Sequence, residues 1–181
     1  MYKRQLFTQL EIAWGIFLQT SPIMLDRVYH SNSYQIALYY FVNGLCAMLS
    51  IFIVQPWFEK RFTYESATKA LAFITAIFMC LLSIKTSYAA FTSIMFMMTF
   101  FEFLLFTSLL VQISNTASKD SKGMVMGMVS SLIGISFLIS DVFMLVVSES
   151  SIAQNFLFAA LILPFYKKPN LPFNYKSLMT R

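Results

Sequence analysis

Six apolar stretches constrain what this chain can fold into more than any other feature of its sequence. A helix that spans a bilayer needs about 20 predominantly apolar residues, with a range of about 17–25. The polar gaps between the stretches are short, as expected for a compact helical bundle. The stretches are Phe7–Leu25, Tyr34–Val54, Ala67–Ile84, Ala89–Ile113, Gly123–Val147 and Ile152–Tyr166. The sequence therefore predicts an all-α membrane protein, with six transmembrane helices in residues 1–166 and a basic tail in residues 167–181.

The composition argues against a soluble globular domain. Of the 181 residues, 58% are hydrophobic and 12% are charged, whereas roughly a quarter of an ordinary soluble domain is charged. Thirteen basic and eight acidic side chains are too few to cover the surface of such a domain. The first and last stretches are the weakest candidates for spanning helices. The first contains Glu11, Gln19 and Pro22, and the last is short and contains Pro164.

The basic residues lie in alternate gaps between the stretches. All but two of the 13 belong to the N-terminus, the gaps after the second and fourth stretches, and the tail; Arg27 and Lys85 are the exceptions. Those in the first set are Lys3, Arg4, Lys60, Arg61, Lys69, Lys119, Lys122, Lys167, Lys168, Lys176 and Arg181. Because Lys and Arg favour the cytoplasmic side of membranes, we predict a multi-pass plasma (inner) membrane protein with both termini in the cytoplasm. The tail is expected to act as an anchor near anionic lipid headgroups.

Glu102 is the most informative polar residue within the predicted spans. It lies near the middle of the stretch Ala89–Ile113, among phenylalanines and leucines. A charged carboxylate at the centre of a bilayer costs about 2.5–3.5 kcal/mol on insertion scales, so it should face the bundle interior or a wet cavity. Removal from water also favours the protonated acid. Glu102 is therefore a candidate site for a proton or a substrate cation, and the alternative is a neutral acid that bonds to a neighbouring helix.

Four further polar residues within the predicted spans are candidates for a substrate or proton pathway. Glu11 lies about one turn into the first stretch, and Asp141 lies near the outer end of the fifth, so hydration at the surface could account for both. Asn43 could instead serve helix packing. Gln19 lies shortly before Pro22, where a helix kink would expose backbone groups to a cavity.

No pattern of an enzyme or of a cofactor site occurs in the sequence. His30 is the single histidine and has no companion with metal-ligand spacing. No Gly-x-Ser-x-Gly nucleophile motif and no phosphate-binding glycine-rich loop occur. Cys46 and Cys80 both lie within apolar stretches, where a disulfide framework is not expected. The basic residues form no stripe of the kind that binds nucleic acid. We therefore predict a protein that is not an enzyme and that binds neither a metal, nor a cofactor, nor nucleic acid.

The segment Ser114–Met128 resembles the cytoplasmic loop between the tenth and eleventh helices of major facilitator superfamily transporters. In that family a polar loop with acidic and basic residues leads into a Gly-x-x-x-Gly at the start of a helix. Gly123 and Gly127 take these places here, with Lys122 just before them. Glycines four apart lie on one helix face, where they let a neighbouring helix approach closely. Glu59 stands where the family's loop between helices eight and nine carries an acidic residue.

The resemblance covers nearly the whole chain, as helices seven to twelve of a twelve-helix transporter. It implies a major-facilitator-like half bundle that moves a small-molecule substrate, with proton coupling as one option. Such transporters place the substrate between two six-helix halves, near the middle of the membrane. The partner would be a separately encoded half or a second copy of this chain, and a truncated remnant would have none. The alternatives are a six-helix scaffold or accessory subunit without a substrate and, more remotely, an intramembrane enzyme.

Overall fold

The computed structural model describes residues 2–62, 64–84, 86–146 and 152–163. The described part of the chain is helical, with short turns and no strand, which confirms the predicted all-α class. The helices are α1 (Tyr2–Arg27), α2 (Ser33–Leu49), α3 (Gln55–Arg61), α4 (Tyr64–Leu82), α5 (Tyr88–Ser114), α6 (Lys122–Val146) and α7 (Ile152–Ile162). A π-helical turn, Ser50–Val54, joins α2 to α3, and a 3-10 turn, Lys119–Ser121, precedes α6.

Three helical stretches are long and apolar enough to cross a membrane, judged by length and composition. They are Ser33–Phe58, Tyr88–Ser114 and Lys122–Val146. Two further helices, Ala67–Leu82 and Ile152–Ile162, are apolar but shorter. The long helix α1 does not reach the same apolarity. Three of the six predicted spans are therefore strongly apolar helices in the structure, and the crossing of a membrane by all six stays a prediction.

The second predicted span continues further than the sequence indicated. Its start is defined by a capping box, in which Asn32 Oδ1 accepts a hydrogen bond from the Gln35 backbone N–H and Gln35 Oε1 accepts one from the Asn32 N–H. Its end was predicted at Val54, where the apolar stretch ends. In the structure a π-helical turn follows, in which the Gln55 N–H bonds back to the Ser50 carbonyl, and helix α3 continues directly from it. Much of the predicted cytoplasmic gap is therefore helical.

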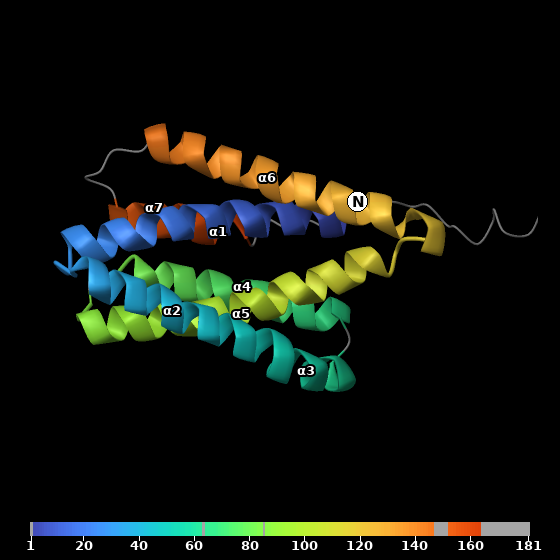
Figure 1. Cartoon of the computed structure of the whole chain (residues 1–181), viewed down its shortest axis with the longest axis horizontal. Coiled ribbons are helices and arrows are strands. Elements are labelled where there is room, and N and C mark those ends of the chain that lie inside the picture. Colours follow the sequence, from blue (N-terminus) through green and yellow to red (C-terminus); the bar gives the residue numbers. More distant parts are fainter. Residues whose placement is uncertain (1, 63, 85, 147–151, 164–181) are drawn as a thin grey trace, which may run out of the picture.

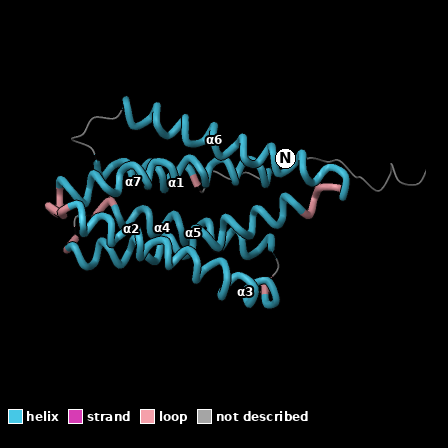
Figure 2. Tube along the Cα trace, viewed as in Figure 1, coloured by secondary structure: helices cyan, strands magenta, loops and turns pink. Residues whose placement is uncertain are grey.

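The helices lie roughly side by side in two sets (Figure 1). One set contains α1, α6 and α7, and the other contains α2, α4 and α5; we call them the α1 set and the α5 set. The sets meet mainly where α1 packs against α5 and where α4 packs against α7, with lighter contacts between α1 and α2 and between α5 and α6. The connecting turns gather at the two ends of the bundle (Figure 2). At one end the Tyr29 hydroxyl donates a 3.1 Å hydrogen bond to the Thr86 carbonyl, which joins the α1–α2 turn to the α4–α5 turn.

Helix α1 forms the centre of the bundle, because it packs against α6, α7, α5 and, more lightly, α2. Most of its apolar side chains are buried; Phe7, Leu10 and Phe17, for example, are fully buried. The ring of Phe17 lies 6.2 Å from that of Phe156 on α7. Within the α5 set, α4 and α5 are antiparallel neighbours that stack Phe78 on Phe101. The predicted tail 167–181 and Pro164 lie outside the described residues.

Candidate functional site

Two buried carboxyl groups from different helix sets approach each other at the centre of the bundle. Glu11 on α1 is 3% exposed and Glu102 on α5 is 1% exposed. The two groups lie close enough to interact electrostatically. Sequence reasoning singled out both residues, but it placed Glu11 near a hydrated surface. Its burial contradicts that interpretation: four helices surround α1, so an early position in the helix is not an exposed one.

Aromatic pairs fix the register of α1 against α5 beside the two carboxyl groups. Phe7, one turn before Glu11, has its ring 5.6 Å from that of Phe106. Trp14, about one turn after Glu11, has its ring 5.5 Å from that of Phe103 in an edge-to-face contact. Along α5 both phenylalanines follow Glu102 within about one turn, so Glu11 and Glu102 lie in the same apolar, aromatic part of the α1–α5 interface.

Neither carboxyl group has its hydrogen-bonding capacity satisfied within the described chain. Oε1 of Glu11 and Oε2 of Glu102 are buried and accept no hydrogen bond there. A buried polar atom without a partner costs about 1–3 kcal/mol, and more if it is charged. Asn43 Oδ1 and Thr99 Oγ1 are buried without a partner as well. Each of these buried atoms without a partner needs an explanation, such as a bound water, an ion or a functional role.

Asn43 lies in the packed interface between α2 and α5. It occupies the same face of α2 as Tyr39, which stacks on Phe96 of α5 with ring centres 5.5 Å apart. The same face continues to Ser50, whose hydroxyl donates a 2.8 Å hydrogen bond to the Phe100 carbonyl. Asn43 is 5% exposed. Its position between two helix–helix contacts fits both a packing role and a pathway role, as the sequence indicated.

Gln19 and Asp141, which the sequence singled out separately, form a pair between α1 and α6. The Gln19 side-chain amide donates a 2.6 Å hydrogen bond to Asp141 Oδ1. Asp141 is exposed, and Gln19 is partly buried. This pair lies about two turns further along α1 than Glu11. It forms a second polar position on the same helix, at the rim of the bundle.

Pro22 does not interrupt helix α1, which continues to Arg27. A proline inside a helix leaves the carbonyl four residues earlier without its usual donor. That carbonyl belongs to Leu18, and it accepts a 3.2 Å hydrogen bond from the Tyr40 hydroxyl of α2. Tyr40 also bonds to the Ser21 hydroxyl at 3.0 Å. A side chain of α2 therefore supplies the donor that Pro22 removes, where the sequence had predicted backbone groups exposed to a cavity.

A close helix approach lies at Gly15, which sequence reasoning missed. A Cβ atom placed on Gly15 would lie 2.8 Å from Ser140 Cβ and still closer to Ser140 Oγ. Ser140 donates a 3.0 Å hydrogen bond to the Ile12 carbonyl of α1, and Ser136 donates one of 3.4 Å to the Thr8 carbonyl. The spacing Ser136-x-x-x-Ser140 in an apolar helix was the available signal, since small residues four apart mark helix contacts in membranes.

The glycines that the sequence assigned to packing make no such contact within the chain. Nothing lies within 4 Å of a Cβ placed on Gly123 or Gly127, and both residues are exposed at the start of α6. Within the described chain they do not serve helix packing, because α1 contacts the opposite face of α6, which carries Val125 and Val129. Lys122 is exposed at the first position of α6. Glu59 lies in α3, and its side chain is outside the described part.

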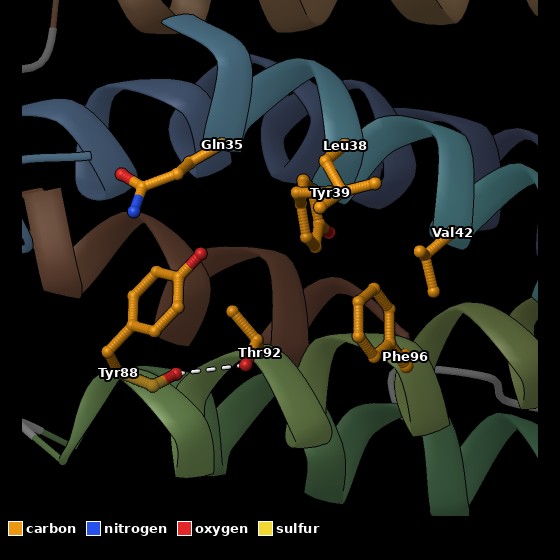
Figure 3. A pocket seen from close by; sticks show the side chains of 7 residues that line it. All are labelled: Gln35, Leu38, Tyr39, Val42, Tyr88, Thr92 and Phe96. Carbon is orange, nitrogen blue, oxygen red and sulfur yellow. Dashed lines mark hydrogen bonds between the residues drawn. The ribbon is translucent and has the colours of Figure 1, made fainter. Parts of the chain in front are cut away.

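A shallow pocket of about 230 Å³ lies between α2 and α5, toward the end that carries the Tyr29–Thr86 contact. Figure 3 shows it between the side chains of Tyr39 and Tyr88, with Phe96 at one side. The remaining lining residues are Gln35, Leu38, Val42 and Thr92. Thr92 bonds to the Tyr88 carbonyl of its own helix. The pocket is mostly apolar, and it is open rather than enclosed.

Comparison with known proteins yields no match to a family model, a curated protein or a solved structure. Function is therefore inferred from the geometry of the bundle.

Proposed function

We propose that this chain is a six-span membrane bundle equivalent to one half of a major-facilitator-like secondary transporter, and that it moves a small molecule together with a second six-helix bundle. The observation that carries the proposal is the pair Glu11 and Glu102, two carboxyl groups buried at the centre of an otherwise apolar bundle. Inserting a charged residue into a bilayer costs about 2.5–3.5 kcal/mol. Apolar side chains would stabilise the bundle better, so this cost favours a role in moving a proton or a substrate.

The distribution of polarity supports a bilayer as the surroundings of the bundle. Large apolar side chains cover the outside of α2 and α6, where water would favour polar ones. Examples on α6 are Leu138, Leu145 and Val146, which are 62%, 85% and 80% exposed. Helix α1 carries polar residues and is shielded from the surroundings by its neighbours. Six crossings follow if α1, α4 and α7 span the bilayer with the three strongly apolar helices.

The charges at the ends of the bundle support the predicted orientation. Lys60 and Arg61 lie at the end of α3, and the Arg61 guanidinium lies 5.2 Å from the centre of the Trp57 ring. Lys122 begins α6 at the same end, and Arg27 ends α1 at the opposite one. Tryptophan and cationic side chains both favour the membrane interface. We therefore place the α3 end in the cytoplasm.

A second bundle is proposed because α6 leaves a continuous face of small residues open. Gly123, Gly127 and Gly134 have nothing within 4 Å of an added Cβ, and Gly44 on α2 is similarly open. Glycines let helices of two bundles approach closely in a membrane. A second copy of this chain or a separately encoded bundle would fit such a face.

Transport can be tested in membrane vesicles from cells that produce the chain, against vesicles from cells that do not. The probes are radiolabelled panels of sugars, amino acids and organic cations, each measured with and without an imposed pH gradient. We expect at least one compound to move faster in vesicles that contain the chain. Glu102→Gln should reduce that rate about 100-fold, within the range of about 10²–10⁴ for loss of a proton-transferring group.

The matched control is Asp120→Asn, which changes an exposed carboxyl group in the turn before α6. Transport by this variant should equal that of the wild type. Equal rates in vesicles with and without the chain would contradict the proposal and favour the scaffold or accessory subunit. Unchanged transport in Glu102→Gln would remove Glu102 from the pathway.

A further inference from the structure

We propose that Glu11 and Glu102 share one proton, and that this proton controls how closely the α1 set packs against the α5 set. The inference deepens the proposed function, on which it rests, by naming the proton as the ion that this pair takes. It also assigns a partner to each residue, which the sequence could not do.

The pair lies at the junction of the two helix sets. Glu11 belongs to α1 and Glu102 to α5, and direct packing of α1 on α5 is one of the few places where the sets meet. Each residue presents one buried oxygen that has no hydrogen-bond partner within the described chain. An interaction between these two side chains therefore acts across the junction. Most of the other packing of these two helices lies within one set, with α1 on α6 and α7 and α5 on α4 and α2.

The burial of the pair selects a proton over larger cations. With 3% and 1% of the side chains exposed, an organic cation cannot reach the carboxyl oxygens unless the sets separate. The rings of Phe7, Trp14, Phe103 and Phe106 pack against each other in this part of the α1–α5 interface. Metal ions such as Ca²⁺ take six to eight oxygen ligands, and no group of three or more acidic, His or Cys side chains gathers among the described residues. A proton needs only the two oxygens present.

On the helices packed against the pair, the other titratable side chains contact different residues or are at least partly exposed. On α6, Asp141 is bonded to Gln19. On α2, Tyr40 bonds to Leu18, Tyr39 stacks on Phe96, and Cys46 is half-buried. On α4, Lys69 and Cys80 are exposed. The described residues of α7 include no titratable side chain. The described structure places no cation against the pair, so a proton is the charge that can balance it.

The protonation equilibrium gives the pair two distinct states. When one carboxylate takes a proton from water, the resulting acid donates a hydrogen bond to the other carboxylate, and one unsatisfied oxygen on each side gains a partner. When that proton returns to water, two like charges face each other away from solvent, which is unfavourable without a cation. The first state holds α1 against α5, and the second drives them apart. Packed interfaces switch between such discrete arrangements more readily than they deform continuously.

Proton sharing can be tested by infrared difference spectroscopy on the chain reconstituted in phosphatidylcholine vesicles, during a pH titration. The spectrum of the wild type minus that of Glu11→Gln/Glu102→Gln isolates the two carboxyl groups. We expect two protonation steps that differ by more than about one pH unit, as for coupled sites. Each single variant, Glu11→Gln or Glu102→Gln, should leave one step at an intermediate pH. Asp141→Asn is the control and should leave both steps in place.

Coincident steps in the wild type would overturn the proposal, and so would a remaining glutamate that titrates as it does in the wild type. Circular dichroism checks folding, and either single variant alone provides the test if the other does not fold. A second measurement follows the distance between spin labels at Phe41→Cys on α2 and Leu138→Cys on α6, after Cys46 and Cys80 are replaced by alanine. The distance should increase at alkaline pH in the wild-type pair and stay constant with Glu102→Gln. A constant distance in both proteins would overturn the proposal that the proton controls the packing of the two helix sets.

Neither measurement requires a substrate. A chain that shows coupled protonation steps but moves no compound would therefore contradict the proposed function alone. A chain that transports a compound but titrates in independent steps would contradict the shared proton alone.

Discussion

Helix α1 carries polar side chains that are buried, whereas helix α6 carries large apolar side chains that are exposed. Helix α1 carries Glu11, Thr20 and Ser21, yet all three side chains are buried. Helix α6 is among the most apolar segments of the chain, yet large side chains such as Leu145 lie on its outside. The two helices pack against each other, so the contrast arises between direct neighbours.

The contrast indicates what surrounds the bundle. In water, a bundle buries its apolar helix faces and exposes its polar ones. In a bilayer the surroundings are themselves apolar, so polar groups and small contact residues collect inside, and apolar side chains face the lipid. The central position of α1 and the peripheral position of α6 follow this second rule.

The largest expected effect comes from truncating the enclosed side of α1. Phe7→Ala removes a fully buried ring that contacts Phe106, and it should lower the free energy of unfolding by about 3–5 kcal/mol. Leu145→Ala on α6 should cost less than about 0.5 kcal/mol, because the side chain is 85% exposed. Unfolding of the detergent-solubilised protein measures both. Similar losses in the free energy of unfolding of the two variants would contradict the difference in burial between α1 and α6.

A smaller loss is expected where α1 and α6 touch. Gly15→Ala forces its new methyl group against Ser140 and should destabilise the bundle by about 1–3 kcal/mol. Gly134→Ala is the matched control on α6, where the added methyl group meets nothing, and it should not destabilise. Adding Ser140→Gly should restore part of the stability of Gly15→Ala. Equal stability of the two alanine variants would contradict the close approach at Gly15.

The hydrogen bonds between α6 and α1 should contribute less than the packing. Ser140→Ala removes the bond to the Ile12 carbonyl, and a loss of about 0.6 kcal/mol, with an upper limit near 1.7, is typical of such bonds in membranes. Ser131→Ala is the control, because Ser131 is exposed and bonds only to its own helix, at the Gly127 carbonyl. A control loss as large as that of Ser140→Ala would show that the interhelical bond contributes nothing specific.

The smallest effect is expected at the rim, between Gln19 and Asp141. The bond is 2.6 Å long, but Asp141 is exposed, so solvent weakens the interaction. A double-mutant cycle with Gln19→Ala and Asp141→Asn should give a coupling free energy of about 0.2–1 kcal/mol. A coupling free energy as large as the cost of Phe7→Ala would place this pair in the core, contrary to the structure.

The helices themselves were predictable from the sequence because their signals are local. All six apolar stretches lie largely in helices, and the polar gaps contain the turns. The second span was predicted to end at Val54, where the apolar stretch ends, whereas the helical stretch continues to Phe58, since a π-helical turn depends on how nearby backbone groups rearrange. That rearrangement is not encoded in a simple residue pattern.

The candidate site was predictable as single residues and not as an arrangement. Glu102 was expected to face the bundle interior, and it does. The cost of removing its carboxyl group from water follows from its place in the apolar stretch, which the sequence alone shows. Its pairing with Glu11 depends on the register between α1 and α5, far apart in the sequence. The same limit explains why Gly123 and Gly127 were chosen for packing and Gly15 was missed: a glycine's contacts depend on which face a neighbouring helix occupies.

The most direct test of the account is whether α1, despite its polar residues, crosses the membrane. Cysteines introduced singly at Gln5, near the start of α1, and at His30, just after its end, can be labelled in intact cells with a membrane-impermeant maleimide, after replacement of Cys46 and Cys80. We predict labelling of His30→Cys from outside, and labelling of Gln5→Cys only after the cells are opened. Labelling of both positions from the same side would contradict the alternating topology and with it the enclosure of Glu11 and Glu102 within a membrane-spanning bundle.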